Sequence, residues 1–206
     1  MSDYVVGNCL HLYLQNYALL ESLEEQGELP PDLKDEEQLL MSFSERASEQ
    51  AATLLESLYT QLVVGGSLRY RTDRRSQKRT VRDQWYMEGP FFRPRERTAH
   101  NGWSLLVGCL KDKGPTACMI LFPWEPESTM PLTRLSSQTA ALFGFASADA
   151  RSCFAHDSGY QSGLLIGAAL LSPSTTHDVA AGLIREHIEL FFSKLGPQFD
   201  EALAAT

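Results

Sequence analysis

The sequence predicts an α+β fold, an antiparallel sheet of about five or six strands covered on one face by two long helices. Apolar residues recur at helical spacing over residues 42–64 and 174–195. They alternate at strand spacing after Gly66, and they form nearly continuous apolar runs at 103–110 and 116–122. Central strands that are apolar on both faces need cover, and the apolar stripes of the two helices provide it.

Length and composition indicate one domain, or one domain with an appendage, since the chain has 206 residues of which 43% are hydrophobic. The formal charge of −8 argues against a surface that is basic all over, as nucleic-acid or membrane binding would favour. The N-terminus lacks the layout of a signal peptide, and no apolar run approaches the length of a membrane span. We expect a cytoplasmic protein whose cysteines are reduced: Cys9, Cys109, Cys118 and Cys153.

The N-terminal region predicts a helix of its own. From Leu10 onward the apolar residues share one helical face, and Gly27 and Pro30 end the pattern. We expect residues 1–41 to be a helical appendage with a linker, docked on this chain or on a second copy. The α+β domain is then expected over residues 42–206.

A capping box predicts the start of the first long helix. Ser42 lies three residues before Glu45, the spacing at which each side chain satisfies a free backbone N–H of the first turn. The apolar stripe continues to Leu62, and Gly65 ends the helix. Residues 42–64 are therefore expected to be helical.

The first strands follow Gly66. Residues 68–71 and 80–87 alternate between apolar and polar, and the polar residues 73–78 between them predict a hairpin tip. Gly89-Pro90 predicts the end of regular structure, as does Arg93-Pro94. The apolar runs 103–110 and 116–122 predict a second, central hairpin.

The C-terminal third predicts a short helix, two strands and a long helix. The short helix is expected over 135–145, after a proline-rich loop, and the strands over 151–155 and 164–171. Thr175 and Asp178 have capping-box spacing at the start of the last helix, and Gly196-Pro197 predicts its end.

No catalytic or metal-binding motif is present in the sequence. The loop His156–Ser162 lists the residue types of a triad, but neighbouring loop residues point in different directions. His187 lies beside an apolar stripe, which favours a half-buried, hydrogen-bonded histidine over a ligand. We expect no catalytic residues, no metal and no cofactor, and this loop is the one place where an enzyme of unrecognised type would have its site.

Charge is distributed unevenly along the chain. Residues 1–56 carry a net charge of −10, residues 69–97 a net charge of +6, and residues 98–206 a net charge of −4. Arginine binds phosphate or carboxylate with two parallel hydrogen bonds, and aromatic rings stack on bases. The candidate binding residues of the basic block are Arg69, Arg71, Arg74, Arg75, Lys78, Arg79, Arg82, Trp85 and Tyr86.

Four interpretations of this block stay open. It binds an acidic partner, with Arg74, Arg75, Lys78 and Arg79 at the hairpin tip; it binds single-stranded nucleic acid; it pairs with the acidic residues 1–56 of its own chain; or its tip is a solvated loop that neither binds nor pairs. The negative total charge disfavours the second interpretation.

The C-terminal sequence Leu164-Leu165-Ile166-Gly167-Ala168-Ala169-Leu170-Leu171, followed by Ser174-Thr175-Thr176 at the helix start, resembles that of the class I type III secretion chaperones and the related YbjN-like bacterial proteins. The resemblance also covers the order of elements over residues 42–195. It implies helices packed on a curved antiparallel sheet, in a small acidic protein of bacterial type that forms homodimers, binds another polypeptide and has no enzymatic activity.

The leading functional hypothesis is therefore a non-enzymatic adaptor or chaperone-like protein, a cytoplasmic homodimer that binds a polypeptide, acidic where it meets the basic block. The alternative is a nucleic-acid or phosphate binder that uses residues 69–97, and the third is an enzyme of unrecognised type.

Overall fold

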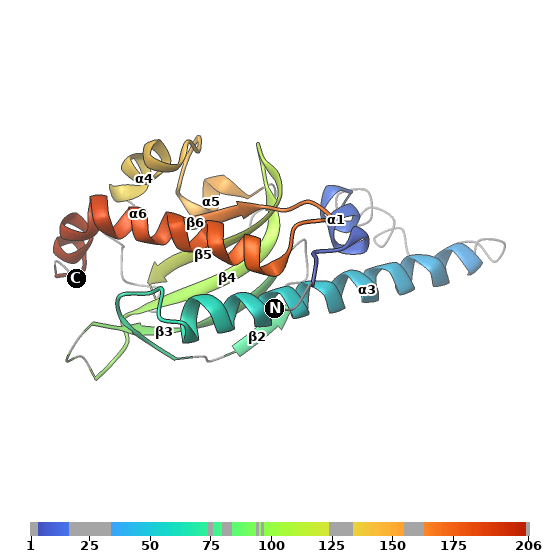
Figure 1. The fold of residues 1–206 in the computed structure, drawn as a ribbon, viewed down its shortest axis with the longest axis horizontal. Helices are drawn as coiled ribbons and strands as arrows, with labels where there is room; N and C mark the ends of the chain where they lie inside the picture. Colours follow the sequence, from blue (N-terminus) through green and yellow to red (C-terminus); the bar gives the residue numbers. More distant parts are fainter. Residues whose placement is uncertain are drawn as a thin grey trace.

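The computed structural model describes residues 4–16, 34–73, 76–79, 84–93, 95, 97–123, 134–154 and 163–204, and for 34–37 and 76–79 it describes the backbone alone. The elements in chain order are α1 (Asn8–Gln15), α3 (Lys34–Leu58), the π-helix η2 (Tyr59–Val64), β1 (Arg71–Thr72), β2 (Ser76–Arg79), β3 (Trp85–Phe92), β4 (Asn101–Leu110), β5 (Gly114–Pro123), α4 (Ser136–Phe143), α5 (Ala150–Cys153), β6 (Leu164–Leu170) and α6 (His177–Ala204). The predicted α+β fold is confirmed (Figure 1).

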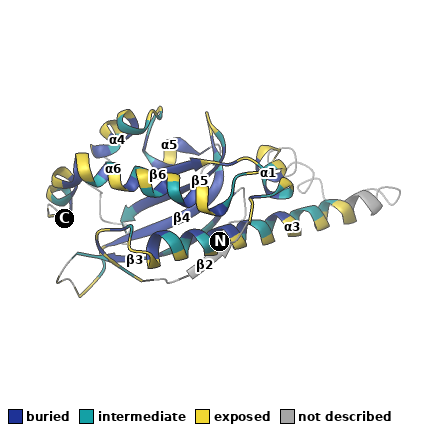
Figure 2. Cartoon of the chain, in the orientation of Figure 1, coloured by how far each residue is buried: buried dark blue, intermediate teal, exposed yellow. Residues whose placement is uncertain are grey.

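The sheet runs in the order β1-β3-β4-β5-β6, and β2 pairs with β3 beside β1. All its neighbouring strands are antiparallel. The hairpin of β4 and β5 occupies the middle, with Leu110 opposite Gly114 and Asn101 opposite Pro123. Both strands are buried along most of their length, which confirms the predicted central hairpin (Figure 2).

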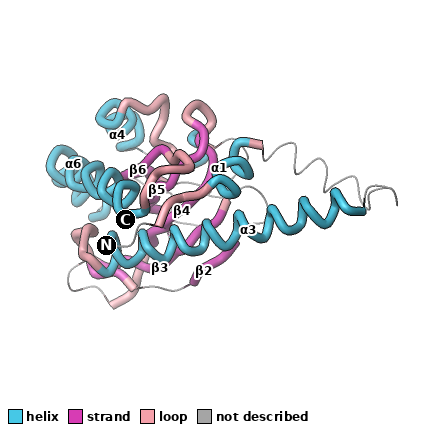
Figure 3. Tube along the Cα trace, turned by 45° about the vertical axis from the view of Figure 1, so that its right-hand side comes forward, coloured by secondary structure: helices cyan, strands magenta, loops and turns pink. Residues whose placement is uncertain are grey.

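The long helices cover one face of this sheet (Figure 3). Trp85, Trp103 and Gly167 share that face by strand register. The ring of Tyr13 in α1 lies 5.1 Å from Trp85, and the ring of Tyr59 lies 6.0 Å from Trp103. A Cβ added at Gly167 would come within 2.8 Å of a carbonyl oxygen of α6, so glycine allows this helix to approach β6 closely.

The opposite face of the central strands is buried as well, and α5 packs near it. A Cβ added at Gly163 would lie 2.8 Å from the Ile120 side chain and 3.2 Å from that of Ala150. The predicted strand over 151–155 is wrong at residues 151–153, which belong to the helical turn α5; Phe154 forms an isolated bridge with Leu110, and residue 155 lies outside the described residues. Asp149 caps this turn by accepting a hydrogen bond from the Arg151 backbone N–H at 2.9 Å. Local capping therefore overrides the weak strand pattern.

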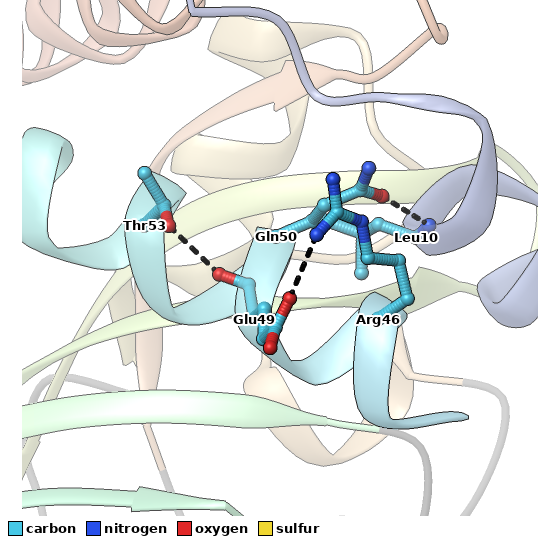
Figure 4. A network of polar contacts seen from close by, with 5 residues as sticks. All are labelled: Leu10, Arg46, Glu49, Gln50 and Thr53. Carbon is cyan, nitrogen blue, oxygen red and sulfur yellow. Dashed lines mark hydrogen bonds and ion pairs between the residues drawn. The ribbon is translucent and has the colours of Figure 1, made fainter. Parts of the chain in front are cut away.

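The N-terminus of helix α1 is capped by a side chain of helix α3 (Figure 4). Gly7, with φ +85°, has no side chain to cap the helix, and Gln50 of α3 accepts a hydrogen bond from the Leu10 backbone N–H at 2.8 Å instead. A Cβ on Gly7 would lie 2.4 Å from the Gln50 amide. The helix ends at Gln15, and the remainder of the predicted first helix, from residue 17, lies outside the described residues.

Helix α3 begins at Lys34 rather than at the predicted residue 42. Ser42 lies inside it, because capping-box spacing also occurs within helices and no glycine or proline interrupts residues 34–58. Leu40 and Phe43 are half-buried against the core. The helical backbone then continues as η2 to Val64, as predicted, so the expected boundary between residues 41 and 42 falls inside one helix.

Strands β1 to β3 differ from the prediction. Residues 76–79, expected in a hairpin tip, form β2, and Gly89-Pro90 lies inside β3. The carbonyl of Pro90 accepts a hydrogen bond from the Asp73 N–H, so the side of Pro90 that lacks an N–H faces the break between β1 and β2. No strand hydrogen bond is therefore lost at this position. A Cβ on Gly89 would lie 1.9 Å from the Asp73 carbonyl oxygen, so glycine permits this crossing.

Helix α6 continues through the predicted stop at Gly196-Pro197 to Ala204. Phe199 and Leu203 extend its apolar stripe and are buried to 0% and 2% exposure. Their burial outweighs the loss of one backbone hydrogen bond at Pro197. The helix begins at His177 rather than at the predicted residue 174, and its cap moves by one residue, since Thr176 rather than Thr175 accepts a hydrogen bond from the first turn.

Candidate functional site

The pairing of β1 with β3 brings the two ends of the basic block together. Arg71 lies opposite Phe92, so Arg69 and Arg71 run alongside the chain that leaves β3. We use the name arginine cluster for the five arginines at the two ends of the block: Arg69, Arg71, Arg93, Arg95 and Arg97. Arg95 is three residues beyond Phe92, which places the two Cα atoms within about 11 Å.

All members of the arginine cluster except the half-buried Arg93 are exposed. The sequence prediction included Arg69 and Arg71 but left Arg93, Arg95 and Arg97 out of the site. They were missed because β1 pairs with the end of β3, and the polar pattern of residues 73–78 does not reveal this register. The signal that would have found them is the recurrence of arginine at alternate positions at both ends of the block, 69 and 71 at one end and 93, 95 and 97 at the other.

One carboxylate is bound inside the arginine cluster. Nη1 of Arg69 lies 3.1 Å from Oδ2 of Asp200, and the Tyr70 hydroxyl donates a hydrogen bond to Oδ1 of the same residue. The Arg69 and Asp200 side chains are 54% and 44% exposed. Gly196 leaves room for this contact, because an added Cβ would lie 3.3 Å from the Arg69 guanidinium. Arg69 therefore pairs with α6.

Tyr70 anchors this contact in the core. Its ring lies 5.5 Å from Phe91 and 5.7 Å from Phe199. Burial raises the pKa of the Tyr70 hydroxyl far above its usual value, and the hydrogen bond to Asp200 raises it further, whereas the charges of Arg69 and Arg93 oppose the rise. The hydroxyl is therefore a permanent donor at neutral pH, fixed between two guanidinium groups.

Arg71 is held by an aromatic ring. Its guanidinium carbon lies 4.4 Å from the centroid of the Phe92 ring, a cation–π distance. Such a contact occupies the flat face of the guanidinium and leaves its in-plane N–H groups available for an anion. Stacking also reduces the side-chain freedom that binding would otherwise remove.

The aromatic residues predicted in the site lie elsewhere. Trp85 is 4% exposed and packs against Tyr13, so no ligand stacks on it without moving α1. Tyr86 is half-buried on the opposite face of β3, and burial raises the pKa of its hydroxyl. Lys78 is opposite Tyr86 in the strand register.

The other predicted site residues lie outside what the structure describes. Arg74, Arg75 and Arg82 are not among the described residues, and the side chains of Lys78 and Arg79 are not described. The predicted tip site therefore stays a prediction.

The histidines, cysteines and carboxylates in the described part of the chain form no group of three or more suited to a metal ion. Nδ1 of His187 accepts a hydrogen bond from the Ala168 backbone N–H at 3.2 Å, and its ring stacks on Phe143 at 4.6 Å. The loop His156–Ser162 lies outside the described residues.

Comparison with known proteins gives no relative: no family model, curated protein or solved structure matches this chain. Among the described residues, no helix has the length and apolar character needed to cross a lipid bilayer.

Proposed function

We propose that this chain is a non-enzymatic adaptor that binds an acidic segment of another polypeptide through the arginine cluster. The observation that carries the proposal is the carboxylate of Asp200, held by Arg69 and Tyr70. This contact supports the proposal because Arg69 and Tyr70 hold a carboxylate, and Arg71, Arg95 and Arg97 are further exposed positive charges of the cluster. Charge-assisted hydrogen bonds of this kind are stronger than neutral ones.

Nucleic acid is the second candidate, because guanidinium groups bind phosphate as well as carboxylate. The aromatic rings of the block favour the peptide, since Tyr70, Trp85 and Phe91 are 9%, 4% and 2% exposed. Binding of single strands usually combines positive charge with exposed rings on which bases stack. These three rings face the core and offer no such platform.

The resemblance to secretion chaperones adds further parts to the proposal. It supports a homodimer of bacterial type that acts in the cytoplasm as a chaperone-like protein. Light scattering coupled to gel filtration tests the dimer, and an apparent mass near 23.0 kDa at micromolar concentration would remove it.

Fluorescence anisotropy with labelled polyglutamate, polylysine and single-stranded DNA tests the binding. The variant Arg71→Gln/Arg95→Gln/Arg97→Gln is compared with Arg46→Gln/Arg134→Gln/Arg151→Gln, which removes the same charge from exposed sites elsewhere. We expect the cluster variant to weaken polyglutamate binding by about tenfold or more, and the control variant by less than about twofold.

Equal losses in the two variants would mean that only net charge matters, and the proposal would be wrong. Tighter binding of DNA than of polyglutamate, with a steep fall in affinity between about 50 and 200 mM salt, would establish the second candidate instead.

A further inference from the structure

A groove of opposite charge lies apart from the arginine cluster. It has a volume of about 600 Å³ and opens to solvent between α3, η2, the start of α6 and the N-terminal residue Tyr4. Its charged lining residues are both acidic, Glu56 and Asp178. We call it the acidic groove.

One wall of the acidic groove is a single polar helix face. Thr53, Glu56, Ser57, Thr60 and Gln61 line it at intervals of three and four residues, next to the apolar stripe of the same helix. The last two belong to the π-helix η2, and single π-helical turns within α-helices occur frequently at functional sites.

The π-helix also fixes the groove against α6. The side-chain amide of Gln61 donates to Ser57 at 3.2 Å and to Oδ1 of Asp178 at 2.9 Å. Arg185 of α6 donates to the Gln61 backbone carbonyl at 3.2 Å. One hydrogen bond leaves most of the acceptor capacity of the Asp178 carboxylate available, since its two oxygens accept about four.

The opposite wall contains a buried histidine beside an exposed tyrosine. His177 is 2% exposed, and both ring nitrogens are buried without a hydrogen-bond partner among the described residues. Its ring lies 6.0 Å from the ring of Tyr4, which is 61% exposed. Burial lowers the pKa of His177, against the opposing effects of Asp178 and the Val5 backbone, so the ring is neutral at pH 7. A neutral ring does not repel a cation in the neighbouring groove.

We propose that the acidic groove binds an alkylammonium group, that of a lysine side chain on a second polypeptide. The two carboxylates compensate the positive charge, and the Tyr4 ring offers a face for a cation–π contact. The groove hydroxyls accept hydrogen bonds from the ammonium group, which has three N–H donors and no acceptor. An anion would meet two carboxylates here, so the preference for a cation is set by charge.

Nuclear magnetic resonance titration tests the groove, with the His177 ring and the Tyr4 and Ser57 amides as reporters. The probes are tetralysine, the free polyamine spermidine and tetraglutamate. We expect tetralysine to shift these resonances and tetraglutamate to leave them unchanged. Spermidine binding more tightly than tetralysine would assign the groove to free polyamines and would overturn the polypeptide part of the proposal.

Two isosteric variants separate the groove from general charge. Glu56→Gln/Asp178→Asn should weaken tetralysine binding by about tenfold, whereas Glu45→Gln/Glu186→Gln, exposed on the same two helices, should change it by less than about twofold. Thr60→Lys places a tethered ammonium beside the groove and should abolish binding. Equal effects of the two double variants, or shifts spread over the whole surface, would refute the site. The arginine-cluster variant should leave tetralysine binding intact, so the two proposals fail independently.

Discussion

Replacing Tyr70 with phenylalanine isolates the hydroxyl that holds Asp200. The ring and its contacts with Phe91 and Phe199 remain, and the hydrogen bond to a carboxylate is lost. A hydrogen bond to a charged group contributes about 1.5–3 kcal/mol when both partners are buried. Here the Asp200 side chain is 44% exposed and keeps its contact with Arg69, so we expect a loss of about 1 kcal/mol.

The loss should depend on pH in a defined direction. Because the pKa of Tyr70 is raised in the folded protein, the unfolded chain loses this proton first, at about pH 10. The stabilisation is therefore fully present below about pH 10 and is lost as the pH rises further. Urea unfolding followed by tryptophan fluorescence should show the gap between wild type and Tyr70→Phe closing between about pH 9.5 and 11.

At neutral pH the same change corresponds to a fall in Tm of about 2–4 °C for a chain of this size. The exposed Tyr4, changed to phenylalanine, serves as the control and should show neither effect. A gap of constant size from pH 7 to pH 11 would refute the reasoning, because packing and not the hydroxyl would then account for the loss.

Three further changes test other contacts by the same unfolding measurement. Gln50→Ala should cost about 1 kcal/mol through loss of the cap on Leu10, and an unchanged midpoint would show that α1 is held by apolar packing alone. Gly167→Ala should cost about 1–3 kcal/mol, since its Cβ would lie 2.8 Å from a carbonyl oxygen of α6, whereas Gly182→Ala, in open space on that helix, should gain up to about 1 kcal/mol. Burial lowers the pKa of His187, so wild type should lose stability as the pH falls below about 6.5, and His187→Gln should make that dependence shallower; identical slopes would contradict this.

Much of the fold follows from apolar periodicity, because burial of an apolar stripe is both a sequence pattern and the dominant stabilising term. The stripes of α3 and α6 and the apolar hairpin of β4 and β5 were predicted on this basis. The errors occur where local signals compete with distant contacts. Gly196-Pro197 is a strong local stop, but Phe199 packs on Tyr70, a residue far away in the sequence that no local window around Phe199 contains. Likewise, Pro90 is accepted in a strand because of the break between β1 and β2.

The prediction of the arginine cluster was incomplete for the same reason, because distant contacts decide which arginines come together. Charge density identified residues 69–97 as a unit, and Arg69 and Arg71 within it. Which arginines come together depends on the register of β1 and β3. The acidic groove left no signal in the sequence, since it is formed by one helix face, a single residue before α1 and the first turn of α6.

The proline inside α6 divides the backbone of that helix into two hydrogen-bonded stretches. Before the proline, α6 packs on β6 around Ile184 and His187, whereas after it the buried side chains are Phe199 and Leu203 and the ion pair is that of Asp200 with Arg69. Without the N–H of Pro197, the last turns are able to open without breaking the helical ladder before them. Deuterium should therefore enter the amides of residues 198–204 through local opening, well before it enters those of the preceding turns. We therefore expect the final turns of the helix to open as a separate cooperative unit, which the contacts of Asp200 with Arg69 and Tyr70 stabilise in its closed form.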